Sequence, residues 1–164
     1  MSADNPGMKV IPPKALLATF ANFFALGCGL GLAPKAPGTF GTLLGIPVLL
    51  LMPGNLTMYL VALLVLFLFG VWCCNECSDY LGVHDHGGIV WDEVVGYLVT
   101  MIALPQSWPW LLAGFVVFRF FDIIKPWPIS WVDRQVKGGF GIMIDDVLAG
   151  LMATITLHIV YMIV

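Results

Sequence analysis

The stretch LTMYLVALLVLFLFGVWCC, residues 56–74, decides the fold class, because it contains 19 consecutive residues without a charge. A helix of this length covers roughly 28 Å, close to the hydrocarbon thickness of a bilayer. A second segment, residues 142–164, carries Asp145 and Asp146 near its start and continues with 18 uncharged residues. The pattern predicts two membrane-spanning helices.

The composition of the whole chain agrees with this prediction. Hydrophobic residues make up 60% of the 164 residues and charged residues only 10%, against about 25% charged in soluble domains. The net charge of −3 provides no basic surface for nucleic acid. Because open strands leave backbone groups unpaired in lipid, we predict an all-α, multihelical integral membrane protein. It would have one domain, residues 15–164, after an N-terminal tail, residues 1–14.

Shorter apolar segments complete the expected architecture. Residues 15–33 could just cross a bilayer, but their glycines make an interfacial or re-entrant segment equally compatible. Residues 31–42 are expected to form a structured loop, residues 43–52 are too short to span, and Pro53, Gly54 and Asn55 form a turn. Further helices are predicted at 89–104 and 108–121. Residues 125–139 are expected to be a loop whose tryptophans suit the headgroup level.

The charges are concentrated in one half of the chain. Thirteen of the seventeen formal charges fall between Glu76 and Asp146, where the chain enters and leaves apolar segments. Charge required only for solubility would be spread over the loops. The distribution predicts a polar site at a membrane surface.

Two parts of the charged region resemble each other. Each has a Gly-Gly turn, then an acidic pair opening an apolar helix, Asp92-Glu93 or Asp145-Asp146, and then a glycine one turn later. Such acids can stabilise helix N-termini, which is the simpler interpretation. However, two adjacent carboxylates repel each other and resist entering an apolar segment, so we expect a compensating cation. Hard carboxylate oxygens favour Mg²⁺ over zinc.

Cationic and polar residues near these pairs are candidates for phosphate recognition and acid–base chemistry. Asp122 could bind the metal while Arg119 and Lys125 hold a phosphate, although an ion pair at the interface would explain the same spacing. The segment containing His84 and Asp85 could supply acid–base chemistry, or be only a polar loop. Further candidates are Asp79 as a metal ligand and Lys35, Thr39 and Arg134 as phosphate ligands, with Thr39 in a glycine-rich stretch, residues 37–42.

The four cysteines are not expected to be catalytic. Cys74 and Cys77 have CxxC spacing, but no second ligand pair or redox context accompanies them. With Cys73 they end a long apolar run, so we expect Cys73, Cys74 and Cys77 to be packed in a helix. Nor is any arginine placed six residues after a cysteine, as a cysteine phosphatase loop would require.

Four sequence blocks together resemble the phosphatidylglycerophosphatase A family. They are GCGLGLAPKAPGTFGT (27–42), LGVHDHGGIVWDE (81–93), FRFFDIIKPWPISWVDR (118–134) and GGFGIMIDDVLAG (138–150). The resemblance implies a bacterial inner-membrane, multi-pass enzyme that hydrolyses phosphatidylglycerophosphate to phosphatidylglycerol and inorganic phosphate with Mg²⁺. The lysines near the N-terminus favour a cytoplasmic location for the site.

The resemblance and the residue chemistry together define the predicted site, at which a metal-activated water would attack the phosphate. The alternative is a membrane transport or scaffold protein that binds a divalent metal or anionic lipid. The candidate catalytic residues are Asp92, Glu93, Asp122, Asp145, Asp146, His84 and Asp85; the metal ligands are Asp79, Asp92, Glu93, Asp145 and Asp146; the substrate-binding residues are Arg119, Lys125, Thr39, Lys35 and Arg134.

Overall fold

Within residue 11 and residues 13–163, the part of the chain that this computed structural model describes, every regular element is a helix. The predicted tail, residues 1–14, lies mostly outside that part. The all-α prediction is confirmed. The elements are η1 (Pro13–Ala15), α1 (Phe20–Ala25), η2 (Gly27–Leu32), α2 (Pro37–Leu50), α3 (Leu56–Leu81), α4 (Trp91–Thr100), α5 (Trp108–Ile124), α6 (Ile129–Gln135) and α7 (Gly138–Ile163).

Two of these helices, α3 and α7, are long and apolar enough to cross a membrane, as predicted. Each has 26 residues, and only 22% and 28% of their most apolar windows are buried inside the protein. The core helix of a water-soluble protein would be mostly buried, so these exposed apolar faces suit a lipid environment. The side chain of Asn55, in the predicted turn, accepts a hydrogen bond from the Met58 N–H at 3.1 Å and begins α3.

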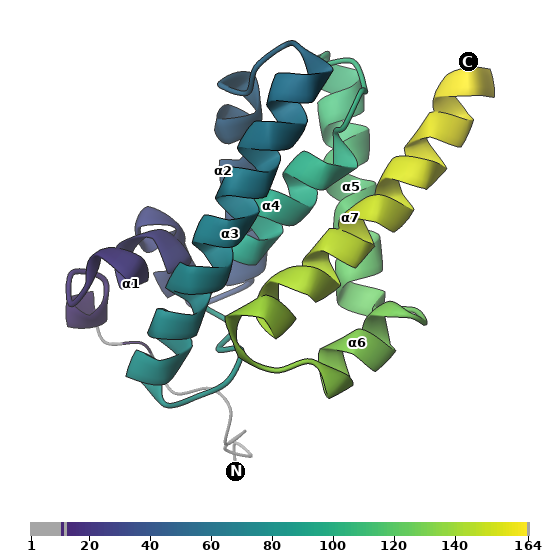
Figure 1. The fold of residues 1–164 in the computed structure, drawn as a ribbon. Coiled ribbons are helices and arrows are strands. Elements are labelled where there is room, and N and C mark those ends of the chain that lie inside the picture. The colour runs from purple at the N-terminus through teal and green to yellow at the C-terminus, as the bar shows by residue number, and fades with distance from the viewer. Residues whose placement is uncertain (1–10, 12, 164) are drawn as a thin grey trace.

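The short helix α4 lies at the centre of the molecule, and nine of its ten residues are buried. It packs against α2, α3, α5 and α7, and Figure 1 shows α7 running from beside α6 to the C-terminus. Helices α4 and α7 cross at Gly96 and Gly150, where a Cβ on Gly150 would lie 2.5 Å from the Gly96 carbonyl oxygen. These are the glycines that follow the two acidic pairs, so the crossing brings the pairs together.

Two segments predicted to be loops contain helix. The predicted loop at residues 31–42 is wrong beyond Ala36, because α2 begins at Pro37, and proline is favoured at the first position of a helix. The predicted loop at residues 125–139 contains the short helix α6. Ile129, the first residue of α6, is fully buried, so packing stabilises a turn that has little periodicity in the sequence.

For residues 15–33, where a span and an interfacial segment were both compatible with the sequence, the structure has the short elements α1 and η2, because Cys28 and Gly29 adopt left-handed backbone conformations, with φ of 55° and 103°. The bounds of three predicted helices also differ. Helix α4 spans Trp91–Thr100 rather than residues 89–104. Helix α5 continues past residue 121 to Ile124. Helix α7 begins at Gly138 rather than residue 142, since the side chain of Asn75 in α3 accepts the Gly139 N–H at 3.1 Å and satisfies one free donor at the helix start.

Candidate functional site

Three carboxylates from two helices form the centre of the candidate site. Asp92 and Glu93 lie in the first turn of α4, and Asp146 comes from α7. One ligand oxygen from each lies within 4.8 Å of the other two. The exposed fractions of Asp92 and Asp146 are only 7% and 3%. The structure therefore brings one acid pair and part of the other into a single buried cluster, which we call the acidic cluster.

The helix dipole accounts for only one of the two acid pairs. Asp92 and Glu93 lie at the N-terminus of α4, where negative charge is favourable. Asp145 and Asp146 lie two turns inside α7, because that helix begins at Gly138, so the expectation that this pair opens a helix is wrong. The influence of a helix terminus fades within its first turn. Another source of stabilisation is required for the α7 pair.

Several oxygens of these acids have no hydrogen-bond partner although they are buried. They are Oδ1 of Asp92, Oε2 of Glu93, Oδ1 of Asp145 and Oδ2 of Asp146. A buried charge without a partner is costly, so an ion or ligand at this position would stabilise the charged form. Without one, burial, reinforced by the neighbouring carboxylates, raises the pKa of Asp92 and of Glu93 well above the usual range.

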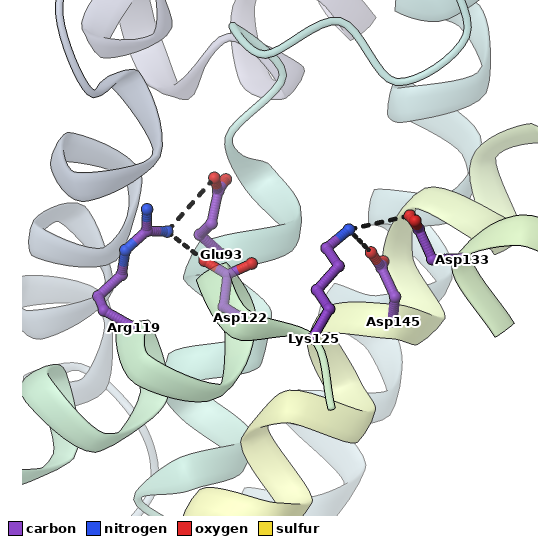
Figure 2. A network of polar contacts seen from close by, with 6 residues as sticks. All are labelled: Glu93, Arg119, Asp122, Lys125, Asp133 and Asp145. Atoms are coloured by element: carbon purple, nitrogen blue, oxygen red, sulfur yellow. Dashed lines mark hydrogen bonds and ion pairs between the residues drawn. The ribbon is translucent and has the colours of Figure 1, made fainter. Parts of the chain in front are cut away.

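Arg119, near the end of α5, borders the acidic cluster on one side (Figure 2). Its Nη1 atom lies 3.7 Å from Oε1 of Glu93 and forms an ion pair with Asp122 one turn further along α5. The Arg119 side chain is only 16% exposed, and its Nε is buried without a partner. Arg119 thus brings a guanidinium group beside the acidic cluster, and Asp122 fixes the orientation of that group.

Lys125, the residue that ends α5, forms a second ion-pair group in Figure 2. Its Nζ lies 2.9 Å from Oδ1 of Asp133 in α6 and 2.6 Å from Oδ2 of Asp145 in α7. Burial by itself would lower the pKa of Lys125, but the two carboxylates raise it above the usual range. Burial by itself would raise the pKa of Asp133, but the ion pair with Lys125 lowers it below the usual range. Lys125 therefore remains charged and holds α5, α6 and α7 together.

Asp133 was not among the residues predicted for the site. It lies in a segment that we expected to be a loop, next to the predicted substrate-binding residue Arg134. Its role follows from α6, which carries it to Lys125. Only its membership in the 118–134 block pointed to it.

The other predicted site residues lie further from the acidic cluster. Asp85 is exposed, but its charge interacts with those of Lys125, Asp133 and Asp122, so it lies at the edge of the site. Asp79 is exposed on α3, where its Oδ2 accepts a hydrogen bond from Asn75 Nδ2 at 3.1 Å. Thr39 is half-buried in the first turn of α2, and His84, Lys35 and Arg134 are exposed.

The cysteine cluster is part of the packing between α3 and α7. Cys73, Cys74 and Cys77 are free thiols, fully buried in α3, and Sγ of Cys74 lies 3.8 Å from Sδ of Met143. The prediction that they are packed within a helix is confirmed.

Replacing all three buried cysteines with alanine should therefore leave most of the phosphate release that the family resemblance leads us to expect. Each substitution removes a small buried group, so a lower melting temperature is expected, with about 1 kcal/mol lost per site. Phosphate release and thermal unfolding in detergent measure the two effects separately. A folded but inactive Cys74→Ala variant would instead indicate a thiol nucleophile.

Comparisons with known proteins agree on one family. The family model described as phosphatidylglycerophosphatase A matches residues 23–161. The phosphatidylglycerophosphatase A of Escherichia coli K12 is 46% identical over 85% of this chain and 82% of its own. The protein of that name from Haemophilus influenzae is 44% identical over 94% of each chain. A Bacteroides thetaiotaomicron protein, described as a candidate phosphatidylinositol-3-phosphatase, is 39% identical over 81% of this chain and 88% of its own. No solved structure matches.

Proposed function

Because the chain belongs to the phosphatidylglycerophosphatase A family and is therefore a phosphatase, we propose that it hydrolyses the phosphate monoester of phosphatidylglycerophosphate at the acidic cluster. The products are phosphatidylglycerol and inorganic phosphate. The observation that carries this assignment is the set of buried, unpartnered oxygens on Asp92, Glu93, Asp145 and Asp146, with the Arg119 guanidinium group 3.7 Å from Glu93. Acceptors for a cation and a donor for a phosphate thus lie side by side.

The donors of the acidic cluster fit a divalent cation, and we propose Mg²⁺. Asp92, Glu93 and Asp146 would hold it, since their oxygens converge within 4.8 Å and lack other partners. Asp145, half neutralised by Lys125, lies beside them with one oxygen free. When bound, Mg²⁺ would neutralise phosphate charge and activate a water molecule.

The side chains of the protein have separate roles in the proposed reaction. Arg119 binds the phosphoryl oxygens, and Asp122 holds its guanidinium group toward them. A water oxygen bonds to phosphorus while the bond from phosphorus to the glycerol oxygen breaks. A carboxylate of the acidic cluster accepts the water proton and passes it to the departing glycerol oxygen, which leaves as the hydroxyl of phosphatidylglycerol. Lys125 holds Asp145 in place beside this centre through their ion pair.

The position of the site favours chemistry at a membrane surface over transport. Asp92 and Glu93 lie in the first turn of α4, and Asp122 lies in the last turn of α5. A transport site would be expected near the middle of spanning helices. We propose that the protein lies in the bacterial inner membrane with α3 and α7 spanning, and that the site lies at the cytoplasmic face, which the lysines near the N-terminus favour. The exposed Trp127 and Trp131 beside it suit the headgroup region.

A phosphate-release assay on the purified protein in detergent tests this function. With Mg²⁺ present we expect release from phosphatidylglycerophosphate, and excess chelator should abolish it until Mg²⁺ is restored. Phosphatidylinositol 3-phosphate serves as the competing lipid substrate, because one relative is described by that activity. Faster release from the inositol lipid would replace the proposed substrate. Full activity in excess chelator would contradict the proposed metal dependence. If neither lipid released phosphate, a transport or scaffold role would be favoured.

A further inference from the structure

The glycine-rich stretch at the start of α2 has no role in the reaction proposed above, yet it contacts the acidic cluster. Gly38 and Gly41 are buried and face α4. A Cβ on Gly38 would approach Oε1 of Glu93 far closer than 3.0 Å, the limit below which real Cβ contacts essentially do not occur. It would also lie 3.0 Å from Nη1 of Arg119. The backbone of α2 therefore lies directly against the Glu93 carboxylate and its arginine partner.

Gly41, one turn further along α2, fixes the other side of the same contact. A Cβ there would lie 2.7 Å from the Val90 Cβ, 2.8 Å from the Val90 carbonyl oxygen and 3.3 Å from Oε2 of Glu93. Oε2 is the buried glutamate oxygen that has no hydrogen-bond partner. Both carboxylate oxygens of Glu93 are thus confined by α2. One of them is Oε2, the oxygen left free for a ligand.

We propose that Gly38 is a positioning residue of this site: its missing side chain sets where the Glu93 carboxylate and Arg119 can lie. A larger residue at position 38 would force the glutamate away from Asp92 and Asp146 and separate it from Arg119. The role assigned to this stretch is therefore different from a phosphate-binding loop, since α2 acts through Glu93. This inference rests on the proposed metal site and, in its activity measurement, on the proposed phosphatase reaction.

Helix propensity makes the substitution Gly38→Ala informative. An alanine inside a helix is ordinarily favoured over glycine by roughly 0.5–1 kcal/mol, so an open position would be stabilised by it. Any loss of stability or of metal affinity in Gly38→Ala must then come from the contact of the new Cβ with Glu93 and Arg119. The chain offers two matched controls on other glycines. A Cβ on Gly45, on the same face of α2, would meet the Tyr97 ring instead, at 2.8 Å, and one on Gly54 would meet nothing within 4 Å.

The experiment compares Gly38→Ala with Gly45→Ala and Gly54→Ala in detergent. Electron paramagnetic resonance measures Mn²⁺ affinity, thermal unfolding measures stability, and phosphate release measures kcat and KM. We expect Gly38→Ala to weaken Mn²⁺ binding and lower kcat by about 10- to 100-fold, the range for residues that orient metal ligands. Gly45→Ala should change stability more than Mn²⁺ affinity, and Gly54→Ala should change neither.

A second variant isolates the path through Glu93. In the Glu93→Asp background the side chain is shorter by one methylene, so its carboxylate lies further from position 38. Gly38→Ala should therefore change Mn²⁺ affinity and the melting temperature much less in this background than in the wild-type protein. If Gly38→Ala fails to fold, recovery of the fold in the double variant supports the proposal and continued failure overturns it. The proposal is also overturned if folded Gly38→Ala binds Mn²⁺ as tightly as the wild type. It is overturned as well if the effects of Gly38→Ala and Glu93→Asp are additive. Absence of phosphatase activity in the wild-type protein, with Mn²⁺ affinity still dependent on Gly38, would refute the proposed function alone.

Discussion

Asp146→Asn is expected to lower kcat for phosphatidylglycerophosphate by about 100-fold or more while the protein stays folded. The side chain is 3% exposed and contributes a carboxylate oxygen to the acidic cluster, and its Oδ2 has no partner. Asparagine keeps the shape but supplies a neutral, weaker ligand. Because the change also removes a buried charge that no protein donor satisfies, the melting temperature without metal should be equal or higher. Asp92→Asn should behave in the same way.

Phosphate release and thermal unfolding, each with and without Mg²⁺, check this result. Wild-type protein should be stabilised by Mg²⁺, and Asp146→Asn should lose most of that stabilisation. Asp79→Asn is the matched control, because Asp79 is an exposed acid on α3 that bonds to Asn75. Near-normal kcat in Asp146→Asn would exclude the acidic cluster as the reaction centre, and an inactive Asp79→Asn would move the site toward α3.

Arg119→Lys is expected to reduce kcat/KM by about 100-fold, the loss typical of removing one donor that stabilises transition-state charge. Lysine keeps the positive charge but loses the planar fork that can hold Asp122 and a phosphate together. The side chain is 16% exposed and lies 3.7 Å from Glu93, so its position is fixed by neighbours on two helices. The fold should persist, since the charge balance around Glu93 and Asp122 is unchanged.

Arg134→Lys provides the control for this variant. Arg134 is exposed in the last turn of α6, where either cation satisfies the helix terminus. Steady-state kinetics in detergent should therefore give wild-type values for Arg134→Lys and a large loss for Arg119→Lys. Equal kinetics for wild type and Arg119→Lys would reduce Arg119 to an ion-pair partner and leave Lys125 as the remaining cation beside the acidic cluster.

The class of fold and the acidic character of the candidate site could both be predicted from the sequence. Long uncharged stretches can satisfy their backbone only as helices in lipid, which is why α3 and α7 were predictable. The repeated pairs Asp92-Glu93 and Asp145-Asp146 marked an acidic centre, because adjacent carboxylates in apolar surroundings need compensation. Residue chemistry and hydropathy are local properties, and they can be read along the chain.

Which of those residues lie together depends on how the helices pack. The crossing at Gly96 and Gly150 joins the two acid pairs, and a close backbone contact of this kind depends on three-dimensional packing rather than on periodicity. The early start of α7 places its acids two turns inside the helix, because Asn75 of α3 satisfies the Gly139 N–H.

The same limit explains the remaining differences between sequence and structure. Helix α6 is too short to have a clear periodicity and is held by burial of Ile129, so Asp133 reaches Lys125 from a segment that looked like a loop. The glycines of α2 suggested a phosphate loop by composition, but their backbone packs against Glu93. Composition identifies the residues that can approach closely or carry charge, and the packing of α2, α4, α5 and α7 selects their partners.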